Sequence, residues 1–303
     1  MTAANDKLLK LIHDTKAVSI WNHRTGPVFW YAASVPGPFY VNTELVIGPA
    51  IAETLLEKIT AIVANTNDLA QRAKQLTELI LDAHKKSPMY QQVITAMVDA
   101  AKSEFPAGNF DVVSGGERRD WLFSIPFAKS IGARHVFLFK NQSVFCAQRL
   151  KPDEKALHIA DLINNAASYF DLWFPILAKA QLHYAGTICV NSRGTNGMQR
   201  LREHGKKTVA LNSVDTGFFE KWRAGGLIDQ DTLTEIKAYF TSPGDWAAQY
   251  LMQDVALFDV PGLDKKSFER LQSFFANDPW SLKKDHPDFF AAMKDEVAKR
   301  LNG

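Results

Sequence analysis

One group of candidate functional residues lies in the turn SGGERRD, directly after the apolar run at 110–113. A glycine pair lets backbone N–H groups approach an anion closely, and adjacent arginines can neutralise phosphate oxygens through paired hydrogen bonds. The candidate anion-binding residues are Gly115, Gly116, Arg118 and Arg119. In the alternative interpretation this is a solvated turn in which Glu117 and Asp120 pair with the arginines.

A second group follows the apolar run at 156–160, where Asp161 offers a carboxylate. A helix is predicted over 166–181, and the unpaired N–H groups at a helix start are a common way to bind phosphate. Asparagine amides and a serine hydroxyl could donate further hydrogen bonds to the same anion. The candidate phosphate-loop residues are Asn164, Asn165, Ala166, Ala167 and Ser168.

A third group could bind a planar, anionic ring. Arg193 lies in the loop NSRGTNG, and Phe39 and Tyr40 lie in an aromatic segment far from it in sequence. An aromatic wall with one guanidinium is a plausible pocket for such a ligand. The alternative is a surface arginine and two core aromatic residues.

Strands and helices alternate in the part of the chain that carries these loops. Short apolar runs predict five strands, at 110–113, 135–139, 156–160, 186–190 and 208–211. Helical stretches separate most of them, which is typical of an α/β protein whose parallel sheet is covered on both faces. Ligands of such sheets bind outside the carboxyl ends of the strands, where the candidate loops lie.

The sequence divides into three predicted parts. Residues 1–108 are mostly helical but include an aromatic, Gly- and Pro-rich segment at 26–42. Residues 109–225 form the α/β core, and residues 226–303 form a helical C-terminal extension.

Composition limits the classes of function. The chain has 35 basic and 33 acidic residues, a net charge of +2, without the basic face that nucleic-acid binding requires. It has no apolar run of about 18 residues that would span a membrane, and its N-terminus does not look like a secretion signal. Cys146 and Cys189 have no zinc-site spacing. We therefore expect a cytoplasmic protein that binds neither nucleic acid nor membrane.

Five segments, in order, resemble the orotate phosphoribosyltransferase family. They are SVPGPFYVNTELVIGP, FDVVSGGERRDWL, ALHIADLINNAAS, GTICVNSRGTNGMQRLREHG and TVALNSVD, within about residues 15–225. The resemblance implies a type I phosphoribosyltransferase-like parallel sheet flanked by helices, with an N-terminal hood and extra helical segments. It also implies transfer of ribose 5-phosphate from phosphoribosyl pyrophosphate to orotate, Mg²⁺ as a cofactor and a homodimer.

The resemblance assigns roles to individual residues. Asp161, Arg119 and Lys140 match positions that serve catalysis in the family. Phe39 and Tyr40 match the hood stretch that lies along the base, and the matching arginine for the orotate ring is Arg193. The glycine pair and Arg118 match the pyrophosphate turn, and residues 164–168 match the loop that binds the 5-phosphate.

The sequence also departs from the family pattern, so we interpret its phosphoribosyl pyrophosphate loop as degenerate. Ala160 stands where the family has the first of two acidic residues, and Ala166 stands where it has glycine. A positive φ at alanine costs about 1–2 kcal/mol, so the loop must differ if the family glycine serves that conformation. The segment FKNQSVFCAQRL at 139–150 lacks most cations of the family's closing loop, which supplies charge to the leaving group.

Three functions remain open. The chain could be an active phosphoribosyltransferase, or a catalytically impaired relative that binds a pyrimidine base or nucleotide for regulation or interaction. It could also be a structural subunit of a true enzyme. His158 lies within an apolar strand, and we expect it to be a core residue.

Overall fold

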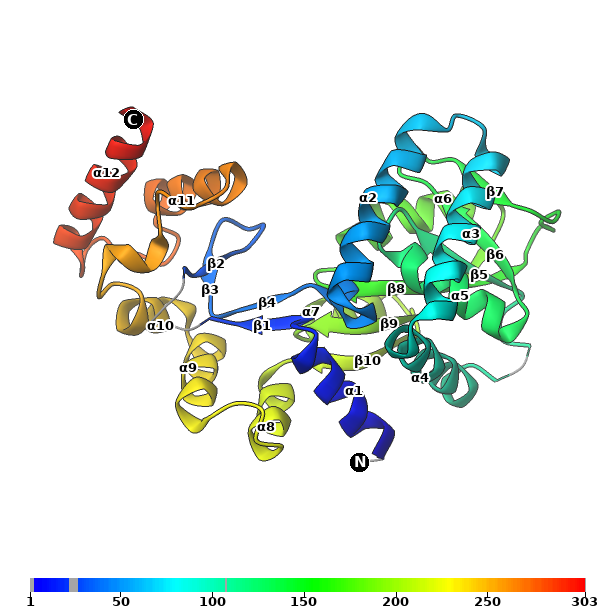
Figure 1. Cartoon of the computed structure of the whole chain (residues 1–303), viewed down its shortest axis with the longest axis horizontal. Coiled ribbons are helices and arrows are strands. Elements are labelled where there is room, and N and C mark those ends of the chain that lie inside the picture. Colours follow the sequence, from blue (N-terminus) through cyan, green and yellow to red (C-terminus); the bar gives the residue numbers. More distant parts are fainter. Residues whose placement is uncertain (1–2, 22–26, 107, 303) are drawn as a thin grey trace. The chain divides into compact units, whose positions relative to one another are not determined.

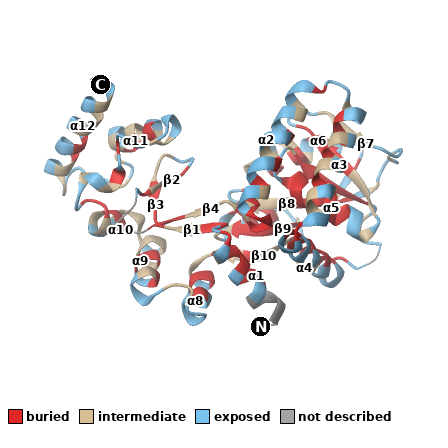
Figure 2. Cartoon of the chain, in the orientation of Figure 1, coloured by how far each residue is buried: buried red, intermediate tan, exposed pale blue. Residues whose placement is uncertain are grey.

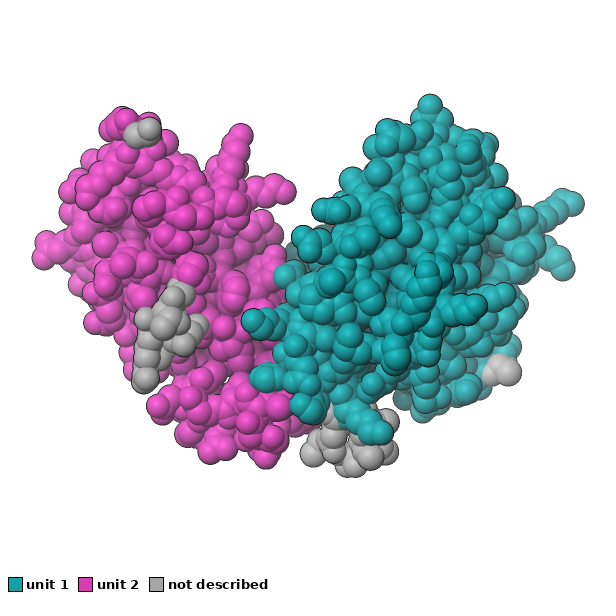
Figure 3. Space-filling view, in the orientation of Figure 1, with its two compact units in different colours: residues 1–17, 42–215 teal, residues 18–41, 216–303 magenta. Residues whose placement is uncertain are grey.

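The computed structural model describes residues 3–21, 27–106 and 108–302, so Gly26 of the predicted hood segment lies outside the described residues. The chain forms two compact units (Figure 3), the first from Met1–Ala17 and Asn42–Asp215, the second from Val18–Val41 and Thr216–Gly303. This division differs from the three predicted parts. The aromatic segment joins the C-terminal helices instead of the N-terminal ones.

The first unit is built on a six-stranded sheet with the order β10-β9-β8-β5-β6-β7 (Figure 1). Its strands are β5 (Val112–Gly116), β6 (Arg134–Leu138), β7 (Val144–Cys146), β8 (Lys155–Ile163), β9 (His183–Arg193) and β10 (Thr208–Val214). All neighbours are parallel except β7, which runs antiparallel to β6. The predicted α/β class and all five predicted strands are confirmed, whereas β7 was not predicted.

The strands and one helix together hold nearly half of the buried residues of this unit (Figure 2). That helix is α5 (Asp120–Ile131), in which every residue from Asp120 to Ala128 is buried. It packs on β5 and β8, and α3 (Leu69–Lys86) and α4 (Pro88–Glu104) pack against it in turn. Because α4 also contacts β9 and β10, α4 and α5 both pack directly on the sheet.

The remaining elements of the first unit are all helical. They are α1 (Ala3–Asp14), the 3-10 helix η1 (Thr43–Ile47), α2 (Pro49–Asn65), the π-helix η2 (Tyr169–Trp173), α6 (Phe174–Lys179) and α7 (Asn196–Glu203). Residues of η2, α6 and α7 share an apolar cluster with β5, β6, β8 and β9. The sheet thus contributes side chains to this cluster as well as to its contact with α5.

The second unit combines two short antiparallel strand pairs with helices. Its elements are β1 (Val18–Ile20), β2 (Phe29–Trp30), β3 (Pro36–Gly37), β4 (Phe39–Val41), α8 (Thr216–Ala224), α9 (Gln230–Thr241), α10 (Pro243–Tyr250), η3 (Val255–Phe258), α11 (Lys265–Asn277) and α12 (Pro287–Asn302). β1 pairs with β4, and β2 pairs with β3.

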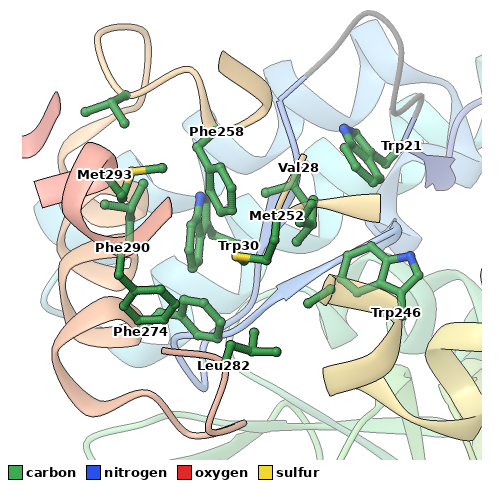
Figure 4. Close-up of a cluster of buried hydrophobic side chains, with 14 of the residues drawn as sticks. Trp21, Val28, Trp30, Trp246, Met252, Phe258, Phe274, Leu282, Phe290 and Met293 are labelled. Atoms are coloured by element: carbon green, nitrogen blue, oxygen red, sulfur yellow. The ribbon is translucent and has the colours of Figure 1, made fainter. Parts of the chain in front are cut away.

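Aromatic side chains hold this unit together (Figure 4). The ring of Trp30 lies 6.0 Å from that of Phe258 and 5.9 Å from that of Phe274, while Trp21 meets Trp246 edge-on at 5.8 Å. Large aromatic rings dominate the burial energy of a small core. These contacts explain why the segment 18–41 groups with the C-terminal helices. Among the described helices of the whole chain, none has the length and apolar character needed to cross a bilayer.

Candidate functional site

The first unit has a cavity of about 240 Å³ at the carboxyl ends of β5, β6 and β8, which we call the strand-end pocket. Its lining residues are Glu117, Arg118, Arg119, Asp120, Lys140, Ala160, Asp161, Leu162, Ser168, Tyr169, Leu172 and Trp173. Parallel strands place their following loops along one edge, which is why residues distant in sequence meet here. The pocket brings together five predicted site residues: Arg118, Arg119, Lys140, Asp161 and Ser168.

The two arginines have partners outside their own turn. The Nη2 of Arg119 lies 3.0 Å from the Oε1 of Glu44 in η1, a carboxylate that is only 8% exposed. Arg118 donates a hydrogen bond to the hydroxyl of Thr60 in α2. No ion pair of either arginine with Glu117 or Asp120 is found, so the alternative of a self-paired turn does not hold. Glu44 was not among the predicted site residues, because no local signal links it to a turn more than 70 residues away.

Asp120 is a second residue that sequence analysis did not place in the site. Its Oδ2 accepts a hydrogen bond from the backbone N–H of Gly116 at 3.2 Å, and its Oδ1 accepts one from the N–H of Asp161 at 3.0 Å. One carboxylate therefore joins the ends of β5 and β8. The Asp120 carboxylate therefore occupies the N–H of Gly116, which was predicted to bind an external anion.

The glycine pair has a packing role in the structure. A Cβ at Gly115 would lie under 3.0 Å from the side chain of Ser124, and one at Gly116 would overlap the ring of Trp173. Both glycines are buried in β5, and neither lines the pocket. The following Glu117–Arg118 peptide bond is cis. Both positions do require glycine for close contact, but the contact is with side chains of the protein and not with a bound anion.

Asp161 is partly exposed and faces the pocket. Burial, and then the adjacent Asp120 carboxylate, raise the pKa of Asp161 well above its usual range, although Arg119 opposes the shift. One Asp161 oxygen accepts a 2.6 Å hydrogen bond from the N–H of Leu162. A carboxyl group that keeps its proton can donate a hydrogen bond to an oxyanion.

The predicted phosphate loop reaches the pocket only through its last residue. Asn164 and Asn165 are exposed, the N–H of Ala167 donates to the Oδ1 of Asn165 at 3.0 Å, and only Ser168 lines the cavity. Ala166 is buried and has a φ of 60°, so the left-handed conformation is present without glycine. Alanine therefore adopts a positive φ here at a strain of about 1–2 kcal/mol, and a difference from the family loop stays a prediction.

The helix after the loop closes one side of the pocket. Its π-helical turn η2 places Tyr169, Leu172 and Trp173 in the lining. Such π-turns interrupt regular helices and are frequent at functional sites. The aromatic wall of the pocket thus comes from η2, which lies within the predicted helix 166–181, although its π-turn and its place in the lining were not predicted.

The predicted base-binding residues are divided between the units. Arg193 ends β9 in the first unit, whereas Phe39 and Tyr40 lie in β4 of the second. Phe39 is 1% exposed, and its ring packs 5.2 Å from that of Phe219, as the core alternative predicted. Tyr40 is partly exposed. A base pocket formed by these three residues remains a prediction.

A serine–histidine–aspartate chain runs from the pocket into the core. The Nδ1 of His158 lies 3.0 Å from the Oγ of Ser114, and its Nε2 lies 3.5 Å from the Oδ2 of Asp120. Ser114 and His158 are completely buried, so no substrate can reach the hydroxyl as a nucleophile. The expectation that His158 is a core residue is confirmed.

The residues present do not form a protein-held Mg²⁺ site. Within residues 3–21, 27–106 and 108–302 there is no group of three or more side chains of metal-ligand type. The pocket has two aspartates: Asp120, which accepts two backbone hydrogen bonds, and Asp161, whose pKa is raised. Magnesium prefers ionised oxygen ligands in near-octahedral geometry, and this pair does not provide them.

Comparisons with known proteins agree on the fold. No protein-family model matches the chain. No curated protein is detectably similar to it in sequence. Among solved structures, UMP synthase from Leishmania donovani matches with a TM-score of 0.56 and 12% identity, over 79% of this chain and 42% of that one. Orotate phosphoribosyltransferase from Francisella tularensis matches with a TM-score of 0.51 and 10% identity, over 78% of this chain and 98% of that one.

The chain therefore has a type I phosphoribosyltransferase fold. The resemblance to orotate phosphoribosyltransferases is confirmed at the level of the fold, and this chain spans less than half of the UMP synthase that it matches.

Proposed function

We propose that the chain binds a small phosphorylated ligand, of the nucleotide or phosphoribosyl pyrophosphate class, in the strand-end pocket and has lost most or all transfer activity. The observation that carries this proposal is the composition of the pocket wall. Arg118, Arg119, Lys140 and Ser168 provide donors, while the position of the first family carboxylate is Ala160. Glu117 and Asp120 also line the wall, but their oxygens already accept hydrogen bonds from backbone N–H groups, so the donors are the groups that a bound oxyanion would meet.

The charge balance supports binding. Arg119 is half exposed although it pairs with Glu44, and no partner of the Lys140 ammonium is found among the described residues. A phosphate could replace solvent around these groups and form charge-assisted hydrogen bonds. Pockets for whole drug-sized ligands usually measure about 300–1,000 Å³. The strand-end pocket, at about 240 Å³, is smaller and suits the phosphate or pyrophosphate group of such a ligand.

The carboxylates of the pocket argue against catalysis. The family reaction passes through an oxocarbenium-like state, which ionised carboxylates beside the ribose would stabilise. Here one carboxylate is replaced by Ala160, and the raised pKa of Asp161 favours its neutral form. Any Mg²⁺ in this proposal would arrive with the phosphate oxygens of the ligand.

Isothermal titration calorimetry with pyrophosphate, phosphoribosyl pyrophosphate, orotate and orotidine monophosphate, with and without Mg²⁺, tests the proposal. We expect saturable binding of the phosphorylated ligands and about tenfold weaker binding after Lys140→Gln or Arg118→Gln. The matched control is Lys129→Gln, an exposed lysine in the last turn of α5 that does not line the pocket.

A parallel assay follows orotate consumption in the presence of phosphoribosyl pyrophosphate. Turnover that disappears in Asp161→Asn would support the second candidate, an active transferase, which the presence of Asp161 in the lining favours. Absence of binding for every phosphorylated ligand would refute both candidates and leave the structural-subunit hypothesis.

The proposal retains two expectations that rest on family resemblance, a homodimer and a cytoplasmic location. Light scattering coupled to size-exclusion chromatography tests the first. A monomeric mass over the concentration range of the binding assays would contradict it.

A further inference from the structure

The second unit contains an apolar groove of about 540 Å³ between α11 and α12, which we call the α11–α12 groove. Its lining residues are Gln272, Phe275, Ala276, Lys283, Pro287, Phe290, Ala291, Met293, Lys294 and Val297. The volume lies within the range of about 300–1,000 Å³ that is usual for small-molecule sites.

The floor and walls of the groove are aliphatic and aromatic. Phe290 and Met293 belong to the buried core of the unit (Figure 4), and each also contributes to the lining. Phe275 and Val297 are partly buried and pack against the same core. Methionine adapts readily to irregular apolar ligands, and the core behind it keeps the floor in place.

The charges on the groove all have one sign. Lys283 and Lys294 are exposed lining residues, Gln272 is the third polar group, and no acidic residue lines the groove. In the part of the chain that the structure describes, neither ammonium forms a hydrogen bond or an ion pair. By contrast, Lys299 on the same helix pairs with Glu296. An anionic group is therefore the complementary charge at this rim.

The dimensions favour a small molecule over a partner helix. Along α12 the lining runs from Pro287 to Val297, which corresponds to about 15 Å of helix. A stable protein partner usually covers about 800 Å² on each side, which is more than a groove along about 15 Å of helix offers. The geometry points to an amphiphilic carboxylate, with an aliphatic chain on the apolar floor and its carboxylate between Lys283 and Lys294, as the ligand of the α11–α12 groove. This site lies entirely in the second unit and is independent of the strand-end pocket.

Calorimetric titration of the full chain with decanoate, below its micelle concentration, tests the assignment. We expect saturable binding at one site per chain. Ala291→Phe places a large side chain in the groove and should abolish binding, whereas Ala292→Phe, at the next and equally exposed position outside the lining, should not. Arg118→Gln in the first unit should also leave decanoate binding unchanged.

The contribution of the lysine charges to decanoate binding is measured separately with Lys283→Met and Lys294→Met, which remove the ammonium group and retain an apolar side chain. Each should weaken decanoate binding about two- to fivefold, as expected for exposed ion pairs, and should not weaken binding of the neutral alcohol decanol. Because both lysines are exposed, these variants test the proposal even if Ala291→Phe does not fold. Absence of saturable decanoate binding, persistence of binding in Ala291→Phe, or equal losses for decanoate and decanol in the lysine variants would overturn the assignment.

Discussion

The turn after β5 and the loop after β8 depart from the family pattern in opposite ways. The turn keeps its glycine pair, yet those glycines pack against Ser124 and Trp173, and the N–H of Gly116 binds Asp120. The loop has Ala166 where the resemblance places a glycine, and this alanine has a φ of 60°. In neither place does the residue type alone show whether the backbone serves a ligand.

Residue types in a motif are therefore poor evidence, on their own, for a binding site. In the turn, glycine persists for a steric reason that is independent of any ligand. In the loop, the surrounding structure must hold a positive φ at an alanine, which alone disfavours it. One substitution tests each interpretation.

The largest effect is expected for Gly116→Ala. Its methyl group would overlap the buried ring of Trp173, and overpacking of this kind costs about 1–3 kcal/mol or more. Urea denaturation measures the loss in the free energy of unfolding, and Trp173→Leu in the same chain should recover part of it. Gly225→Ala is the control, because its Cβ would make only an ordinary 3.4 Å contact. A Gly116→Ala protein as stable as the control would mean that the glycine serves a ligand and not packing.

An intermediate effect, dependent on pH, is expected for Asp161→Asn. Burial and Asp120 raise the pKa of Asp161 in the folded state above the unfolded value of about 3.9, so the folded chain binds this proton more tightly. The resulting stability is present below about pH 4 and is lost as the pH rises toward the folded value. Asparagine does not titrate, so the stability of Asp161→Asn relative to the parent should increase from pH 4 to pH 7.

Chemical denaturation across this pH range measures the effect. Asp171→Asn, an exposed residue of η2, is the control and should run parallel to the parent. Parallel curves for Asp161→Asn as well would show that Asp161 ionises normally, which would remove the electrostatic argument against catalysis.

The smallest effect is expected for Ala166→Gly. Relief of about 1–2 kcal/mol of strain is offset by about 0.5–1 kcal/mol of glycine backbone entropy and about 0.8 kcal/mol for the lost methyl group. The free energy of unfolding should therefore stay within about 1 kcal/mol of the parent. Ala128→Gly, buried within the helix α5, has no strain to relieve and should lose about 2 kcal/mol. Equal losses in the two variants would show that Ala166 is not strained.

The sequence predicted the sheet because five buried runs stand out between helical stretches. It predicted the pocket edge because polar loops follow these runs, and Arg118, Lys140, Asp161 and Ser168 do meet there. β7 was missed because it is a three-residue, half-buried edge strand without clear alternation.

Other features depend on tertiary structure and leave no local signal. The pairing of Glu44 with Arg119 and the bridge from Asp120 to the β8 end join residues that are far apart in sequence. The two-unit division was missed for the same reason, since Trp30 finds Phe258 and Phe274 more than 220 positions later.

The discontinuous second unit has a consequence for biosynthesis. Its first segment, 18–41, leaves the ribosome before all of residues 42–215, whereas its helical partners follow after them. At about 5–20 residues per second, roughly 10 to 50 seconds pass between the synthesis of Trp21 and Trp30 and that of their aromatic partners Trp246, Phe258 and Phe274. During that interval the first unit can complete its sheet, while the aromatic segment is available to chaperones or to the same segment of a neighbouring nascent chain.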